Sequence, residues 1–277
     1  MLLLSVNLFA QSKIDATQLK VFSPDENSIQ YNEIYTQNFF FGNLGLKQLM
    51  SAIPINNQSV KTMKIAATNS MKKNQAIMEL HYDQEGKIHQ MKIFEAFFGD
   101  VMVIDYRYKE GLLDEEIITH NNQTKRNKFY YTDGKMIVEN TKGILDVYSL
   151  NGKVLSKTNY MDGNLLMMDK MEGKCRLTLY RKQPINKVCF SNLNLEYPLT
   201  IDEFSNNEDK NGKLKLEKNL SLTLKKVNEF NYSILSNNNE LYTLKLTKDM
   251  RVKELNFLGV KAEHVSPVDY TFNYINY

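Results

Sequence analysis

The chain has 277 residues, of which 42% are hydrophobic and 24% are charged, and its formal net charge is +3. This composition is too apolar for an intrinsically disordered chain. With 35 basic and 32 acidic residues, the charge balance does not indicate nucleic-acid binding, which calls for a clustered basic face. The length suits one large domain or two ordinary ones.

Residues 1–10, MLLLSVNLFA, are apolar and uncharged, and the polar residues Gln11, Ser12 and Lys13 follow them. This pattern is typical of the core and cleavage edge of a secretory signal peptide; a short buried strand is the alternative. The segment is too short to span a bilayer, and we expect no transmembrane span later in the chain. We therefore predict a signal-peptide remnant and an exported protein that is periplasmic, extracellular or associated with the outer membrane.

Residues 11–76 are predicted to form an N-terminal cap. Leu46, Leu49, Met50 and Ile53 recur at helical spacing, which predicts a short amphipathic helix over residues 44–53 that ends at Pro54. Because this segment carries one lysine, packing against a sheet edge is favoured over a membrane-surface helix.

A short phrase recurs in the middle of the chain: an acidic residue or asparagine, then glycine, and an apolar side chain two residues later. Asn151-Gly152-Lys153-Val154 is one example. Glycine adopts positive φ without steric cost, so such pairs between alternating runs are a strong β-hairpin signal. The glycines predicted to lie at turns are Gly86, Gly111, Gly134, Gly152, Gly163, Gly173 and Gly212.

The spacing of these glycines indicates a repeat over residues 77–204. Intervals of roughly 20 residues from Gly86 to Gly152 suit two strands per unit, and intervals of roughly 10 residues through Gly163 and Gly173 suit one strand plus a turn. One such unit cannot bury its apolar face alone, so neighbouring units must stack into a single twisted antiparallel sheet.

Residues 205–277 are predicted to form a C-terminal β subdomain after the polar tract 205–212. Leu220–Leu224, Leu241–Leu246 and Tyr270–Tyr277 alternate between apolar and polar residues, as strands with one buried face do. An outer-membrane barrel is the alternative, but lysine-rich strands fit poorly in lipid. The predicted fold class is mainly β: an elongated antiparallel β-meander of hairpin repeats, with a short N-terminal helical cap and a C-terminal β subdomain.

A family resemblance appears in Gly143–Tyr148, Asn151–Val154 and Tyr160–Gly163. This stretch resembles the variant MORN repeat of bacterial, often antitoxin-like, proteins. It is less closely similar to the tyrosine-aspartate repeats of bacterial cell-surface proteins. The resemblance covers roughly residues 78–184. It implies a β-hairpin repeat with a binding role and carries over no catalytic residue.

Cys175 and Cys189 are compatible with a disulfide in an oxidising compartment or with two buried thiols. A turn centred on Pro184 and Ile185 would place Tyr180 opposite Cys189. A disulfide therefore requires a turn centred near Lys182.

The chain shows no motif for catalysis or for a cofactor. His81, His89, His120 and His264 lack metal-ligand spacing. Glu115 and Glu116 are adjacent in a predicted strand, so they point to opposite faces and cannot act as a catalytic pair. We predict no catalytic residue, no metal and no cofactor.

The candidate binding residues are Tyr131, Tyr148 and Tyr160. Aromatic side chains on a wet sheet face can grip a sugar or a peptide, but their hairpin spacing favours packing between neighbouring units. We expect a non-enzymatic binding or structural protein of the bacterial envelope that acts through an extended sheet surface on an unknown protein or glycan partner, with no nucleic acid. The alternatives are an antitoxin-like immunity protein and a secreted carbohydrate-active enzyme whose carboxylates meet only in three dimensions.

Overall fold

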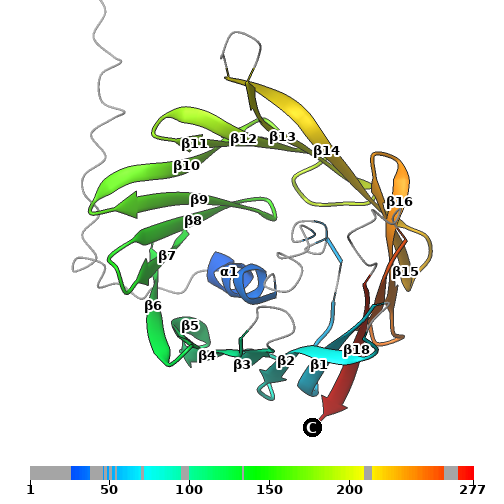
Figure 1. Ribbon diagram of the computed structural model, residues 1–277. Helices are drawn as coiled ribbons and strands as arrows, with labels where there is room; N and C mark the ends of the chain where they lie inside the picture. Colours follow the sequence, from blue (N-terminus) through cyan, green and yellow to red (C-terminus); the bar gives the residue numbers. More distant parts are fainter. Residues whose placement is uncertain are drawn as a thin grey trace, which may run out of the picture.

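The computed structural model describes residues 26–37, 46, 49, 52–53, 55–69, 72–94, 100–132, 134–208, 214–258 and 268–277. Within these residues, α1 (Glu26–Gln37) precedes an 18-stranded sheet in which each strand pairs antiparallel with its sequence neighbours. The last strand pairs with the first, so the sheet closes into a barrel. Figure 1 looks along this barrel and shows α1 inside the ring of strands.

The first half of the barrel consists of β1 (Val60–Thr68), β2 (Gln75–Tyr82), β3 (Ile88–Ile93), β4 (Met102–Lys109), β5 (Leu112–His120), β6 (Gln123–Thr132), β7 (Lys135–Asn140), β8 (Leu145–Asn151) and β9 (Val154–Met161). The second half consists of β10 (Asn164–Glu172), β11 (Cys175–Tyr180), β12 (Gln183–Phe190), β13 (Leu199–Glu208), β14 (Leu214–Lys226), β15 (Asn231–Ser236), β16 (Asn239–Leu246), β17 (Val252–Phe257) and β18 (Asp269–Asn276). The strands on both sides of residue 205 belong to this one sheet, because β13 continues across it.

The predicted mainly β fold, an antiparallel meander of hairpins with a short N-terminal helix, is confirmed. The sequence offered a closed barrel only as the alternative to an open, elongated meander, and closure corrects that preference. It follows from the matching apolar faces of the two end strands, where Ile65 lies opposite Phe272 and Met63 lies opposite Tyr274. Closure removes the two open edges that a flat meander would expose.

The helix predicted over residues 44–53 is not tested by the structure. Most of residues 44–53 lie outside the described residues, although Leu46, Leu49 and Ile53 are buried in the core. The described helix α1 comes earlier in the chain and lies inside the barrel, not on a sheet edge (Figure 1).

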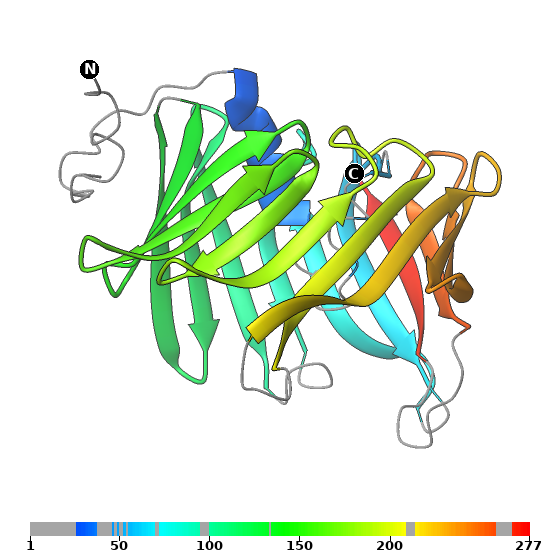
Figure 2. The same cartoon turned by 90° about the horizontal axis from the view of Figure 1, so that it is seen from above.

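Consecutive hairpins reverse the chain at alternate ends of the barrel, as the side view in Figure 2 shows. Positive φ angles occur at Gly86, Gly111, Gly134, Gly152 and Gly173, whose turns share one end, called the glycine rim below. Gly163 also has positive φ but turns the chain at the opposite end, and Gly212 lies outside the described residues. A spacing of roughly 20 residues thus separates glycine turns at the same end of the barrel. A spacing of roughly 10 residues separates glycine turns at opposite ends.

The two faces of the barrel wall have opposite character. The inner face carries most of the buried apolar side chains, such as Ile65, Met91 and Leu244. The outer face carries ion pairs spread around the barrel, which include Lys64–Glu79 (3.0 Å), Arg107–Glu115 (3.0 Å), Lys218–Asp202 (2.6 Å) and Lys245–Glu254 (3.0 Å). This alternation reflects the period of two along each strand.

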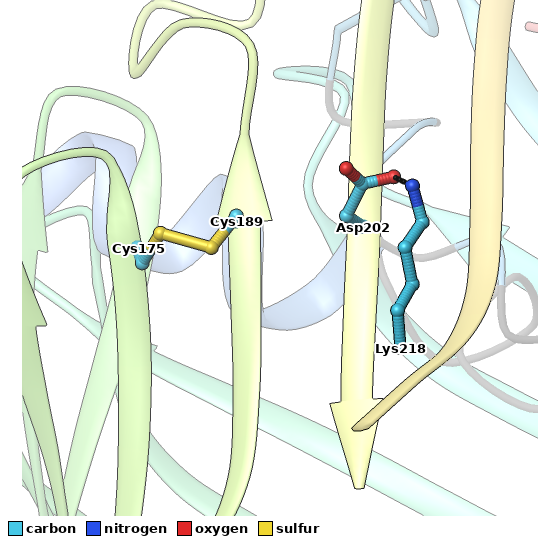
Figure 3. The surroundings of a disulfide bond; sticks show 4 residues. All are labelled: Cys175, Cys189, Asp202 and Lys218. Atoms are coloured by element: carbon cyan, nitrogen blue, oxygen red, sulfur yellow. Dashed lines mark ion pairs between the residues drawn. A yellow bond between two sulfur atoms is a disulfide. The ribbon is translucent and has the colours of Figure 1, made fainter. Parts of the chain in front are cut away.

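Cys175 and Cys189 form a disulfide between β11 and β12 on the outer face, where they lie directly opposite each other (Figure 3). The turn between these strands lies at Arg181 and Lys182, which both have positive φ. This is the turn position that a disulfide requires. The Asp202–Lys218 ion pair lies on the neighbouring strands of the same face (Figure 3).

Candidate functional site: a pocket at the barrel mouth

Helix α1 is held inside the barrel by polar contacts. The Oδ1 atom of the buried Asn32 accepts hydrogen bonds from the Leu113 backbone N–H (3.1 Å) and from the Tyr131 hydroxyl (2.8 Å). The Tyr31 hydroxyl donates to the carbonyl of Gly134 on the glycine rim (2.6 Å). These bonds join α1 to Leu113, Tyr131 and Gly134 of the wall, and they fix the position of the helix.

A second contact joins α1 to the wall deeper in the barrel. Glu116 on β5 accepts hydrogen bonds at Oε2 from the Tyr35 hydroxyl (3.2 Å) and from Asn127 Nδ2 (2.6 Å). Burial raises the pKa of Glu116, although these two bonds oppose the shift. The Tyr35 ring meets Phe129 and Tyr148 edge-on, with ring centroids 5.2 Å and 6.1 Å apart. Tyr35 therefore connects the helix to both an aromatic cluster and a buried acid.

A pocket of about 600 Å³ opens between α1, residues 55–58 and two turns of the glycine rim. We call it the mouth pocket. Its lining residues are Asn32, Glu33 and Thr36 of α1, Ile55, Asn56, Asn57 and Gln58, and Tyr82, Glu85, Gly86, Lys87, Ile88, Tyr108, Glu110, Gly111 and Leu112 of the wall. Its volume lies in the range of small-molecule sites, about 300–1,000 Å³, and the mouth of a β-barrel is a common place for such a site.

The polar groups of the mouth pocket are organised around one lysine. Lys87 Nζ lies 2.5 Å from Glu85 and 5.8 Å from the centre of the Tyr108 ring. The hydrogen bond from Lys87 lowers the pKa of Glu85. Glu33 and Glu110 add two further carboxylates to the lining. The lining residues therefore include three glutamates and one lysine, a formal excess of two negative charges, and the pocket is acidic.

A second cavity of about 440 Å³ is lined by Gln30, Tyr31, Gly134, Leu150, Gly152, Lys153 and Asn194. It shares no lining residue with the mouth pocket, so α1 contributes different side chains to each cavity.

Carboxylates from distant parts of the chain also meet inside the barrel. Asp146 accepts a hydrogen bond from Asn159 (2.7 Å) and lies 3.5 Å from Lys157 Nζ, and Asp169 accepts one from Thr178 (2.7 Å). Burial, followed by the charges of Asp146, Glu116 and Asp169, raises the pKa of Tyr148. The sequence did not predict this group of carboxylates, because only the register of the strands brings Glu116, Asp146 and Asp169 close to Tyr148.

The wall between β9 and β10 is held partly by side chains. Backbone pairing between these strands ends at Met168 and Thr158. Beyond that point, Asp169 accepts the Lys157 backbone N–H (2.9 Å) and Arg176 donates to the Leu155 carbonyl (2.9 Å). The side chains of Asp169 and Arg176, whose Oδ2 and Nε atoms lie 3.8 Å apart, thus bind β9 backbone groups that a neighbouring strand would otherwise pair with.

The three predicted binding tyrosines do not share one surface. Tyr131 is buried against α1, and Tyr148 packs inside the barrel against Tyr35. Tyr160 is buried on the outer face in a small cluster with Ile137 and Leu145. The arrangement is one of packing, which was the alternative that the hairpin spacing favoured.

His81 and His89 face each other across the β2–β3 hairpin, with ring centroids 6.0 Å apart. Among the described residues, no three or more His, Cys, Asp or Glu side chains are grouped so as to hold a metal ion. In the same part of the chain, no helix has the length and apolar character needed to cross a membrane.

Comparison with known proteins leaves the family open. No protein family matches the chain, and no curated protein matches it, so the MORN-like resemblance stays a prediction. Among solved structures, a porin-like protein from Bacteroides uniformis ATCC 8492 is similar with a TM-score of 0.38 and 10% sequence identity, over 80% of this chain and 100% of that chain.

Proposed function

We propose that this chain is a non-enzymatic binding protein of the bacterial envelope that takes up its ligand in the mouth pocket. The observation that carries the proposal is the construction of the pocket from three separate parts of the chain: α1, residues 55–58 and the turns at Gly86 and Gly111. A binding role through an extended sheet surface is less well supported, because Tyr131 and Tyr160 are buried, Tyr148 is partly buried, and the three lie on both faces of the wall.

Export is supported by the leader-like residues 1–10 and by the Cys175–Cys189 disulfide, a bond that persists in oxidising compartments. The ion pairs of the outer face support a barrel wall that contacts water, because a lysine or arginine side chain facing lipid near the bilayer midplane costs about 2–4 kcal/mol. We therefore place the protein in the envelope with its outer wall in water.

Binding is tested by thermal unfolding in the presence of a library of small polar solutes. A ligand of the native state raises the melting temperature by mass action. Gln58→Trp fills the mouth pocket from an exposed lining position and should abolish the shift. The matched control is Gln183→Trp, an exposed position at the start of β12 on the opposite end of the barrel. Equal shifts in both variants would place the binding site elsewhere.

Location is tested by fractionating cells that express the full chain. Alkaline carbonate should release the protein from membranes without detergent. Retention in the membrane until detergent is added would contradict a wall that faces water.

A further inference from the structure

We infer that the ligand of the mouth pocket is a neutral, hydroxyl-rich molecule, a short uncharged oligosaccharide. This inference rests on the proposed function of the same pocket and adds the chemical class of the ligand. Four amide side chains carry it, namely Asn32, Asn56, Asn57 and Gln58, together with the charges around them.

Two of these amides are held in a fixed orientation by the protein. Asn32 uses Oδ1 for Leu113 and Tyr131, and Asn56 uses Oδ1 for the backbone N–H of Gln58 (2.9 Å). Each therefore keeps its NH₂ group for a ligand acceptor. Because the orientation is set before binding, little side-chain entropy is lost when the ligand arrives.

Asn57 adds an acceptor to these donors. Its Oδ1 is buried and has no hydrogen-bond partner in the described part of the chain. Because protein atoms cover it, a ligand hydroxyl reaches this acceptor only after the Asn57 side chain turns toward the pocket, and the new hydrogen bond would then satisfy a buried group. The glutamates of the lining supply further acceptors, and a sugar hydroxyl both donates and accepts.

The charges of the pocket exclude an anionic ligand. Three carboxylates line it, and its lysine, Lys87, is already paired with Glu85 at 2.5 Å. An acidic sugar would meet uncompensated negative charge and find no available ammonium group. Like-charge contacts of this kind act against binding.

A cationic ligand fits the carboxylates but not the amides. An ammonium group donates hydrogen bonds and accepts none, so it gains nothing from the NH₂ groups of Asn32 and Asn56. Glu85 also stays paired with Lys87. A polyol satisfies both kinds of lining group, and the volume of about 600 Å³ accommodates a short oligosaccharide.

The inference is tested by calorimetric titration of the purified full chain with three kinds of probe at millimolar concentration. Maltotriose, cellotriose, mannotriose and N,N′-diacetylchitobiose are the neutral probes, a galacturonic acid trimer is the anionic probe, and spermidine is the cationic probe. At least one neutral oligosaccharide should bind, and Gln58→Trp should weaken that binding at least about ten-fold, or 1.4 kcal/mol. Gln183→Trp should leave it unchanged.

The outcomes separate the inference from the proposed function. Binding of spermidine or of the acidic trimer alone, with loss in Gln58→Trp, would overturn the oligosaccharide and retain the pocket as the binding site. Binding of a neutral sugar that Gln58→Trp does not affect would overturn the mouth pocket itself. A complete lack of binding by the neutral probes would overturn the inference, whatever the solute library shows for other ligands.

Discussion

The interior of the barrel contains two regions that are filled by different kinds of side chain. The inner faces of β13–β18 form an aliphatic lobe, with fully buried side chains such as Leu199, Leu224, Ile234, Leu244 and Leu255. The inner faces of β5–β11 form an α1 lobe, where polar side chains surround the helix and its tyrosines. Apolar packing stabilises without specifying direction, whereas the polar network fixes one position for the helix and hence the shape of the mouth pocket.

The loop 191–198 connects the two lobes at the glycine rim. Its Leu193 carbonyl accepts the Lys153 backbone N–H (3.1 Å) beside the α1 lobe. Its Tyr197 ring lies 5.4 Å from the ring of Tyr232 in the aliphatic lobe. A change in either lobe can therefore reach the other through this loop.

The largest effect is expected in the aliphatic lobe. Leu244→Ala removes a side chain with 0% exposure between Tyr232 and Leu255. It should lower the free energy of unfolding by about 2–5 kcal/mol, because a cavity is left behind. Urea unfolding measures this loss. The neighbouring outer-face variant Lys245→Ala should cost at most about 1 kcal/mol, and equal losses in both variants would argue against an apolar interior.

The next effect concerns the loop that joins the lobes. Gly152 and Gly173 have almost the same φ, +59° and +60°, but a Cβ at Gly152 would lie 2.5 Å from the Leu193 carbonyl oxygen, whereas nothing lies within 4 Å of one at Gly173. Gly173→Ala should cost about 1–2 kcal/mol for its positive φ. Gly152→Ala should cost about 1–3 kcal/mol more, because the loop must shift. Equal melting temperatures of the two variants would show that the contact is unimportant.

The sequence predicted local structure well because local structure depends on neighbours in the chain. Glycine with positive φ produces the turns, and alternation sorts the faces, so that Glu115 contacts Arg107 on the outer face while Glu116 contacts Tyr35 on the inner face, as predicted.

Barrel closure and the mouth pocket could not be predicted in the same way. Closure depends on pairing between β1 and β18, at the two ends of the sheet. The pocket depends on α1, whose buried residues mix Tyr31 with the polar Ser28, Asn32 and Thr36, so the helix lacks the continuous apolar stripe by which amphipathic helices are recognised. Apolar periodicity instead predicted a helix over residues 44–53.

A smaller effect is expected where α1 meets the wall. Asn32→Leu removes the acceptor of the Leu113 N–H and of the Tyr131 hydroxyl. The loss should be about 1–3 kcal/mol, because the buried Leu113 N–H loses its acceptor, whereas the Tyr131 hydroxyl keeps its hydrogen bond to the Leu113 carbonyl (3.0 Å). Tyr131→Phe, which removes only the hydroxyl, should cost less, about 0.5–1.5 kcal/mol. Both changes should also weaken ligand binding, because the α1 lobe sets the shape of the mouth pocket, whereas the aliphatic lobe contributes mainly to stability. Unchanged binding in a folded Asn32→Leu protein would contradict that role.

The smallest effect depends on pH and has opposite signs at two glutamates. Burial raises the pKa of Glu116 inside the α1 lobe, so the stability that its protonated form contributes is fully present below the ordinary glutamate pKa and is lost as the pH rises through the raised value. Glu254 on the outer face has a pKa lowered mainly by its hydrogen bond from Lys245. Its contribution is therefore present above the ordinary pKa and is lost as the pH falls through the lowered value.

Urea unfolding of Glu116→Gln and Glu254→Gln over the acidic to neutral range measures both contributions. Relative to the wild type, Glu116→Gln should gain stability as the pH rises and Glu254→Gln should lose it, and parallel curves for the two variants would contradict the assignment of one acid to the interior and the other to water.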